Sequence, residues 1–229
     1  MINLIDVSYR YRCGTQDVLK KVNALFEQGK THAILGPSGS GKTTLLSIIA
    51  GLDRPTSGTV LVDDDDLSEM DLDKYRRERI SMIFQAFQLF PLLTAIENVC
   101  VPKELKGETV KNAERDEAKQ LLYSVGIDDS LHKRYPANLS GGEQQRVAIA
   151  RVLSSGAKII LADEPTGNLD VANGTEVVTI LRNIAHESGY CVIIVTHNLE
   201  VADACDVVFH MSDGYINRTD DFGLYEVKK

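Results

Sequence analysis

The sequence predicts an α/β fold, in which a parallel β-sheet is covered by helices and a helical lobe is inserted in its middle. Two continuously apolar segments, 158–162 and 191–195, have the length of buried strands. A segment of helical periodicity over roughly 172–187 separates them. Strand–helix–strand alternation with apolar strands is typical of a parallel sheet covered on both faces. From about 86 to 156 the pattern is helical, which predicts the inserted lobe.

Further strands are expected before this lobe. Residues 2–11 and 18–26 alternate apolar and polar side chains, so both are predicted to be half-buried strands. Short β-prone runs predict strands at 31–35, 59–62 and 80–84. The four consecutive aspartates at 63–66 are interpreted as a solvated turn. A metal site is the weaker alternative there, because adjacent carboxylates on a strand point to opposite faces.

Composition and charge exclude several function classes. The 229 residues are 43% hydrophobic and 25% charged, which is ordinary for a globular protein. The net charge of −8 argues against a nucleic-acid-binding surface, so no nucleic acid is expected as a partner. No apolar run approaches the ~20 residues that span a bilayer. The absence of paired cysteine motifs and of a visible signal peptide predicts a cytoplasmic location and free, buried thiols at Cys13, Cys100, Cys191 and Cys205.

Residues 36–43 read Gly-Pro-Ser-Gly-Ser-Gly-Lys-Thr and fit the spacing of a phosphate-binding loop. Glycines let the backbone curl so that N–H groups point at phosphate oxygens, Lys42 adds a positive charge, and the Thr43 hydroxyl suits Mg²⁺. A helix expected over 42–51 directs its positive end at the same phosphates. An ordinary glycine-rich turn is the alternative, and the β-prone run before the loop argues against it. The chain is predicted to bind a nucleoside triphosphate through Gly36, Pro37, Ser38, Gly39, Ser40, Gly41, Lys42, Thr43 and Thr44.

Three polar residues follow the two apolar strands. Asp163 and Glu164 end the first, and His197 follows the second. Ligands of open parallel sheets bind at the carboxyl ends of the strands. Asp163 therefore suits holding Mg²⁺, Glu164 suits polarising a water, and His197 suits contacting a γ-phosphate. A surface acidic pair and a structural histidine are the alternatives.

A second helix start carries an unusual pair of glycines. Ser140 and Glu143 form the spacing of a capping box, so a helix is predicted to begin there. Gly141 and Gly142 each cost up to about 1 kcal/mol in a helix relative to alanine. We interpret them as giving an anion access to bare backbone N–H groups. The chain then has two phosphate-binding helix starts, one in each lobe.

Taken in order along the chain, these segments resemble the motif set of the ATP-binding cassette (ABC) ATPases. Leu-Ser-Gly-Gly-Glu-Gln-Gln at 139–145 resembles the family's signature motif, and Gly-Asn-Leu-Asp at 167–170 its D-loop. Gln85 corresponds to the glutamine loop and His197 to the switch histidine. Tyr11 matches the aromatic residue that stacks on adenine, with Tyr9 as the alternative. The resemblance covers essentially the whole chain.

The resemblance implies one ABC ATPase domain over residues 1–229. Its fold would be that of P-loop NTPases (RecA-like), with a parallel core and an N-terminal antiparallel β subdomain formed by 1–86 and 157–229. A helical subdomain over 87–156 would carry the signature motif.

The resemblance also implies a mechanism in which two copies pair head to tail. ATP held by the phosphate loop of one copy would be covered by Ser140, Gly141, Gly142 and Glu143 of the other. Glu164 would act as base for water, His197 would hold the γ-phosphate, and Asp170 would lie at the dimer seam. Mg²⁺ would be held by Thr43, Gln85 and Asp163.

Within the family, 87–99 and the D-loop resemble the branch of macrolide exporters, lipoprotein-release systems and peptide exporters. This implies an ATPase that powers a separate membrane permease, docked on the helical subdomain near 87–93, and so a location on the inner face of the cell membrane. The residues of 87–93 could instead be the core of the lobe. A non-transporting membrane complex, of the cell-division or mechanotransmission type, is the alternative partner. The cargo stays open, because the permease makes the cargo contacts. ABC ATPases that act on nucleic acid or ribosomes are disfavoured, because they usually carry two cassettes or long insertions.

Overall fold

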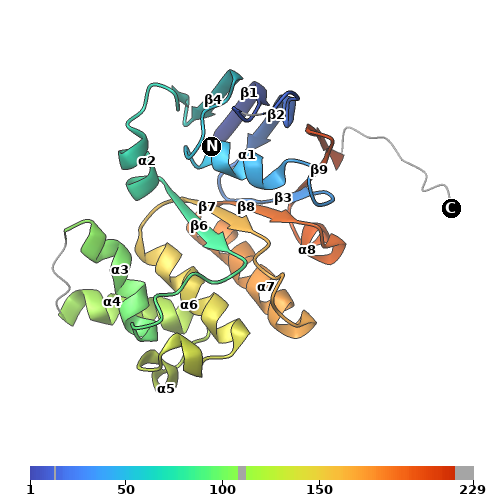
Figure 1. Cartoon of the computed structure of the whole chain (residues 1–229). Coiled ribbons are helices and arrows are strands. Elements are labelled where there is room, and N and C mark those ends of the chain that lie inside the picture. Colours follow the sequence, from blue (N-terminus) through green and yellow to red (C-terminus); the bar gives the residue numbers. More distant parts are fainter. Residues whose placement is uncertain (13, 108–111, 220–229) are drawn as a thin grey trace.

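The computed structural model describes residues 1–12, 14–107 and 112–219, and contains two β-sheets with helices around them (Figure 1). A four-stranded antiparallel sheet has the order β2-β1-β4-β5. Its strands are β1 (Ile2–Tyr9), β2 (Leu19–Phe26), β4 (Ser57–Val62) and β5 (Asp65–Asp66). A six-stranded sheet has the order β10-β9-β3-β8-β7-β6. Its strands are β3 (Thr31–Leu35), β6 (Ile80–Phe84), β7 (Ile159–Asp163), β8 (Cys191–Thr196), β9 (Val207–Ser212) and β10 (Tyr215–Arg218).

The six-stranded sheet is parallel from β6 to β9, and only β10 runs antiparallel to its neighbour. The register pairs Leu35 with Thr196, Asp163 with Val195, and Phe84 with Asp163. The carboxyl ends of β3, β8, β7 and β6 therefore meet at one edge of the sheet. The predicted α/β fold with a parallel core and an antiparallel β-sheet is confirmed.

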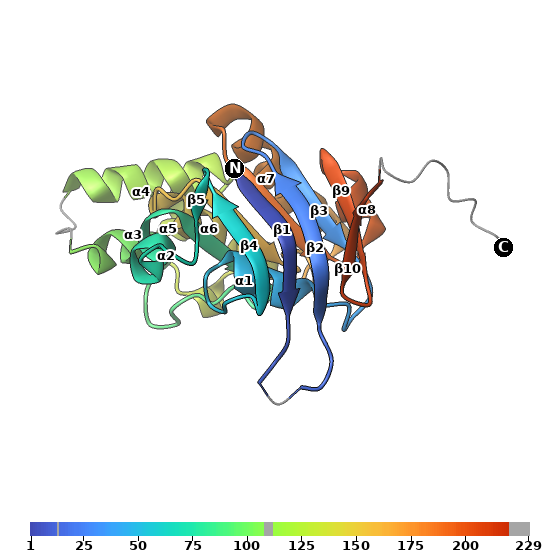
Figure 2. The ribbon, with the colours of Figure 1, turned by 90° about the horizontal axis from the view of Figure 1, so that it is seen from above.

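Helices cover both faces of this sheet. Helix α1 (Lys42–Ile49) lies between the two sheets, and α6 (Gly141–Ser154) and α7 (Val171–Ser188) lie on the other side of the parallel sheet (Figure 1). The helices between β6 and β7 gather at one side of the molecule in Figure 2, and Figure 1 shows that they lie well apart from the antiparallel sheet. Their bounds are α3 (Ala95–Leu105), α4 (Asn112–Ser124), α5 (Asp129–His132), the short 3₁₀ helix Pro136–Asn138 and α6 (Gly141–Ser154). The others are α2 (Leu72–Glu78), α7 (Val171–Ser188) and α8 (Leu199–Asp203).

Alternate residues of the central strands pack into two different hydrophobic cores, one on each face of the sheet. Leu161 and Ile193 pack with α1 and with inward residues of the antiparallel sheet such as Phe26. Ile160 and Ile194, their neighbours in sequence, pack with residues of α3, α4, α6 and α7. Because both faces are covered, these strands are apolar without interruption.

Several details differ from the expectations. The helices α2 and α8 and the strands β9 and β10 were not predicted. The segment 86–93 is irregular, although the helical pattern was expected to begin near residue 86. In the aspartate run, Asp63 and Asp64 form the turn with φ of 50° and 73°, and Asp65–Asp66 forms the short strand β5. Asn and Asp adopt such left-handed angles more readily than other non-glycine residues.

The cysteine and membrane predictions can be compared with the described residues. Cys100 and Cys191 are buried free thiols, whereas Cys205 is only partly buried, so the expectation of burial is wrong for Cys205. Cys13 lies outside the described residues. Among the helices that the structure describes, none has the length and apolar character needed to cross a bilayer.

Candidate nucleotide-binding site

The carboxyl edge of the parallel sheet carries a cavity of about 580 Å³. Its walls come from the loop after β3, the start of α1, the ends of β6, β7 and β8, and the loop after β1. Eleven of the predicted site residues line it: Tyr11, Ser38, Gly39, Gly41, Lys42, Thr43, Thr44, Gln85, Asp163, Glu164 and His197. Residues up to 186 positions apart in sequence therefore share one cavity, because the register aligns the strand ends.

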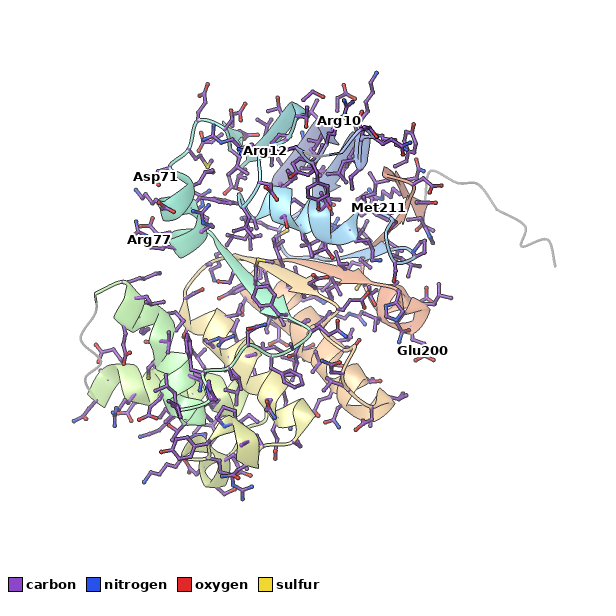
Figure 3. All side chains as sticks on the ribbon, viewed as in Figure 1. Arg10, Arg12, Asp71, Arg77, Glu200 and Met211 are labelled. Carbon is purple, nitrogen blue, oxygen red and sulfur yellow. The ribbon has the colours of Figure 1, made fainter. Side chains whose placement is uncertain are left out.

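Two glycines of the phosphate-binding loop are required by its geometry. A Cβ atom on Gly36 would lie 2.1 Å from the carbonyl oxygen of Met211, which Figure 3 labels on β9. Gly41 directly precedes α1 with φ of 107°, an angle that side chains rarely adopt. The loop thus curls tightly against β9, and α1 begins at once with its N–H groups facing the cavity.

Lys42 is buried within this loop, with 7% of the residue exposed. Its Nζ donates hydrogen bonds to the carbonyl oxygens of Gly36 (2.7 Å) and Pro37 (3.0 Å). The ammonium group is therefore held over the loop at the positive end of α1. Both features favour an anion in the cavity.

Asp163, the last residue of β7, has a perturbed carboxyl group. Burial raises its pKa, and the neighbouring Glu164 adds to the rise, while a hydrogen bond with Thr43 and the charge of Lys42 oppose it. A cation in the cavity would favour the ionised form of this carboxylate. Together with the Thr43 hydroxyl and the Gln85 amide, it offers hard oxygen donors, which are the ligands of Mg²⁺. The described residues hold no cluster of three or more His, Cys, Asp or Glu side chains suited to a metal, and Mg²⁺ typically needs only one or two carboxylates.

Glu164 differs from Asp163 in its backbone. Its φ is 48°, in the left-handed region, and its N–H donates to the carbonyl oxygen of Val195 at 2.9 Å. This conformation turns its carboxylate toward His197, whose Nδ1 lies 2.8 Å from Glu164 Oε1. The Thr196 hydroxyl approaches Oε2 at 3.4 Å. The strained φ is typical of functional positions.

Gln85 forms hydrogen bonds with the segment that follows Glu164. Its backbone oxygen accepts a hydrogen bond from Asn168 Nδ2 at 2.9 Å, and its Nε2 lies 3.3 Å from Asn168 Oδ1. A Cβ on Gly167 would come within 2.8 Å of Gln85 Nε2. Asn168 was not among the predicted site residues, and its place inside the D-loop motif was the only sequence signal for it.

Tyr11 forms the outer wall of the cavity, with 49% of the residue exposed. Its hydroxyl is 2.8 Å from the Thr44 hydroxyl, and its ring meets the Tyr9 ring edge-on at 5.0 Å. Tyr9, the alternative residue, is buried in the core with 9% exposed. Arg10 and Arg12 flank Tyr11 in sequence and lie near the antiparallel sheet in Figure 3.

The remaining predicted residues do not line this cavity. Gly36, Pro37 and Ser40 belong to the loop itself. Ser140, Gly141, Gly142 and Glu143 start α6 in the helical lobe, where Glu143 Oε2 accepts from the Ser140 N–H at 2.6 Å. Asp170 caps α7, and a hydrogen bond from the Asn173 backbone lowers its pKa.

The interpretation of the glycine pair needs a correction. A Cβ on Gly142 would lie 2.1 Å from Asn173 Oδ1, so packing against α7 excludes a side chain there. A Cβ on Gly141 would make ordinary contacts of 3.5 Å with Leu169 and 3.6 Å with Phe87. Packing against α7 therefore accounts for the glycine at 142, but it does not account for the glycine at 141.

Comparisons with known proteins agree with this geometry. The family model "ABC transporter" matches residues 19–167. The chain is 41% identical over 225 residues to the uncharacterized ABC transporter ATP-binding protein MJ0796 of Methanocaldococcus jannaschii, covering 95% of this chain and 96% of that protein. The dimeric, post-hydrolysis structure of the MJ0796 cassette, bound to ADP and Pi, is similar with a TM-score of 0.85 and 38% identity, covering 98% of this chain and 100% of that one.

Two further relatives carry functional names. The lipoprotein-releasing system ATP-binding protein LolD of Shewanella frigidimarina is 42% identical over 221 residues, covering 94% of this chain and 92% of LolD. The macrolide export ATP-binding/permease protein MacB of Shewanella sp. (strain W3-18-1) is 43% identical over 221 residues, covering 93% of this chain and 34% of that longer protein. The phosphate loop, the strand-end carboxylates and these matches together place the chain in the ABC transporter family, as an ATP-binding cassette that hydrolyses ATP.

Proposed function

We propose that two copies of this cassette pair head to tail around ATP and power a membrane export system. One observation carries the pairing. The cavity holds the phosphate loop, whereas the start of α6, with exposed Ser140 and partly exposed Gly141, lies outside it. A second copy could bring its own α6 to cover the cavity. The dimer reported for MJ0796 supports this arrangement.

Within one site, different groups bind the phosphates, the base and the metal ion. The loop N–H groups, Lys42 and the N-terminus of α1 hold the β- and γ-phosphates, and Tyr11 stacks on the base. Thr43, Asp163 and Gln85 would hold Mg²⁺, which neutralises charge on the phosphates when it is bound. Asp170 lies at the seam between the two copies.

Glu164 accepts the proton of the attacking water. His197 holds Oε1 of Glu164 through the 2.8 Å contact, which leaves Oε2, among the residues that the structure describes, with only the long contact from Thr196. The left-handed turn at Glu164 keeps this carboxylate apart from the half-buried Asp163. Catalysis then consists of positioning and charge stabilisation, as expected for phosphoryl transfer.

A second cavity supports docking of a permease. It measures about 620 Å³ and lies between β6, α3 and α6, with Phe84, Leu89, Phe90 and Leu105 among its apolar lining. Leu89 packs on the core of the helical lobe, whereas Phe90 and Leu92 are 48% and 87% exposed. We infer that an amphipathic cytoplasmic helix of the permease binds here. The cassette would then sit at the inner face of the membrane.

The names of LolD and MacB support export rather than a non-transporting complex.

The Glu164→Gln variant tests this proposal. It keeps the size and hydrogen bonding of residue 164 but cannot accept a proton. Light scattering after size exclusion should show the mass of two chains with ATP and of one chain with ADP, and phosphate release should stop. A monomer in saturating ATP would contradict head-to-tail pairing. The wild-type chain in the same buffers is the control.

A further inference from the structure

The segment between Gln85 and Phe90 connects the two cavities. Gln85 lines the nucleotide cavity, and Phe84, Gln88, Leu89 and Phe90 line the cavity between β6, α3 and α6. Any displacement of this segment moves Gln85 and one wall of the second cavity together.

The backbone of the segment is unusual. Phe87 and Gln88 are consecutive non-glycine residues with φ of 58° and 51°. Side chains rarely adopt this left-handed conformation, and two in a row require support from their surroundings. Local bonds supply part of it, because the Phe87 N–H donates to Phe84 and the Gln88 N–H to Ala86.

Arg151 supplies the remaining support for this left-handed turn. Its Nη1 donates to the carbonyl oxygen of Gln88 at 2.5 Å, and its Nη2 donates to that of Phe87 at 3.1 Å. A guanidinium group presents two parallel N–H donors and can bind two adjacent carbonyls, which the single ammonium of lysine cannot do in the same way. Arg151 is half-buried and lines the second cavity.

The environment of Arg151 indicates a specific use of its charge. Burial lowers the pKa of its guanidinium. Among the residues that the structure describes, no carboxylate forms an ion pair with Arg151, and its guanidinium donates to two backbone carbonyl oxygens instead. A simple packing role would be served by an uncharged side chain at lower cost.

Arg151 lies on α6, and the same helix also contacts the loop after β7 that contains Glu164. At the other half of α6, the buried Gln145 donates from Nε2 to the carbonyl oxygen of Pro165 at 2.8 Å, directly after Glu164. The same helix therefore binds the backbone beside Glu164 with one residue and the backbone beside Gln85 with another.

We propose that Arg151 is a positioning residue for Gln85, which holds the left-handed turn at Phe87 and Gln88 and so transmits the position of the helical lobe to the nucleotide cavity. This rests on the proposed role of Gln85 at the bound nucleotide. Loss of the guanidinium frees the turn, and Gln85 leaves its place between the nucleotide and Asn168. ATP still binds, because the phosphate loop and Tyr11 are untouched.

The test uses Arg151→Lys and Arg151→Gln in the full chain, with ATP as the probe. We expect kcat to fall about tenfold or more, as misplaced catalytic groups commonly cause. The Kd for ATP in EDTA should stay within about twofold of wild type, since Gln85 does not hold the nucleotide without metal. Arg79→Lys is the matched control, because its guanidinium pairs with Asp63 away from this segment, and it should keep the wild-type kcat.

A second substitution separates positioning from fold stability. Glycine adopts left-handed angles without strain, so Gln88→Gly should restore part of the kcat lost in Arg151→Gln. Equal losses of kcat in Arg151→Gln with and without Gln88→Gly would overturn the proposal. So would an unchanged kcat in a folded Arg151→Lys protein.

Gln85→Ala distinguishes this inference from the proposed function. If Gln85→Ala lowers kcat and Arg151→Lys does not, only the role of Arg151 is wrong. If Gln85→Ala leaves kcat unchanged, the proposed role of Gln85 is wrong as well. The chain has no tryptophan, so Phe84→Trp gives a single tryptophan, which can be excited selectively, at the start of the segment. Its emission should shift on introducing Arg151→Gln and return toward the original with Gln88→Gly.

Discussion

Glu164 and His197 share a short contact, with 2.8 Å between Oε1 and Nδ1, at the carboxyl edge of the parallel sheet. The glutamate is 17% exposed and the histidine ring 65% exposed, so the ring covers the carboxylate from the solvent side. The pair joins the ends of β7 and β8, and its geometry depends on the left-handed turn at Glu164.

His197→Ala should therefore lower kcat by about a hundredfold, the loss commonly seen when one preorganised group is removed. The Kd for ATP should change little, since the phosphate loop is intact. Steady-state phosphate release and calorimetry with ATP check both values. His186→Ala is the control: His186 also pairs with a carboxylate, Asp206, but at the opposite edge of the sheet. It should lower the melting temperature and keep kcat. Equal kcat in the two variants would remove His197 from the mechanism.

The two glycines that start α6 should respond differently to substitution. Gly142→Ala pushes Asn173 out of its place beside Asp170, so the free energy of unfolding should fall by about 1–2 kcal/mol, as in other overpacked sites.

Gly141→Asp has room to fold, but it puts a negative charge where the partner's ATP would bind. In the Glu164→Gln background it should abolish the ATP-dependent dimer while the chain still binds ATP. Urea denaturation measures the first effect and light scattering the second. A persistent dimer in Gly141→Asp would contradict the composite site.

Tyr11 should contribute to ATP affinity through its ring rather than its hydroxyl. Stacking of a base on an aromatic ring is worth about 1–3 kcal/mol, so Tyr11→Ala should weaken ATP binding about tenfold or more. Tyr11→Phe loses only the hydrogen bond to Thr44 and should stay within about threefold of wild type. Calorimetry with ATP and with inorganic triphosphate separates the base from the phosphates. Tyr135→Ala, at a tyrosine exposed to a similar degree in the other lobe, is the control.

Asp206 should make the free energy of unfolding depend on pH in the acidic range. Burial alone would raise its pKa, but hydrogen bonds from Thr31 and His186 lower the pKa to about 2. A carboxylate whose folded pKa lies below its unfolded value stabilises the fold above the unfolded pKa. This stabilisation is lost as the pH falls from about 4 toward 2. Allowing for solvent screening, the loss attributable to Asp206 should be about 1–2 kcal/mol.

Asp206→Asn removes this titration but keeps an acceptor for Thr31. Urea denaturation between pH 3 and pH 6 should therefore show a flatter dependence of unfolding free energy on pH in the variant than in wild type. Parallel curves for the two proteins would show that the carboxylate does not carry the effect. ATP hydrolysis at pH 7 should be the same in both.

The chain's local sequence determined the parts of the site that depend on short spacing. The phosphate loop and the helix after it are specified by glycines and by Lys42 and Thr43 within a few residues. The apolar strands predicted the parallel sheet, and a parallel sheet brings its carboxyl ends to one edge. Asp163, Glu164 and His197 could therefore be placed together in advance. The capping box at Ser140 and Glu143 was equally local, and both of its bonds are present.

Contacts between distant segments came only from the tertiary structure. The bond between Asn168 and Gln85 joins residues 83 positions apart, and that between Arg151 and Phe87 joins residues 64 apart. Such pairs depend on how α6 and α7 pack against the sheet, which no periodicity encodes. The same packing explains Gly142, whose missing side chain leaves room for Asn173. Spacing along the chain determines which side chains lie together at the end of one strand or at the start of one helix. The packing of helices on the sheet determines which distant backbone segment each of these side chains contacts.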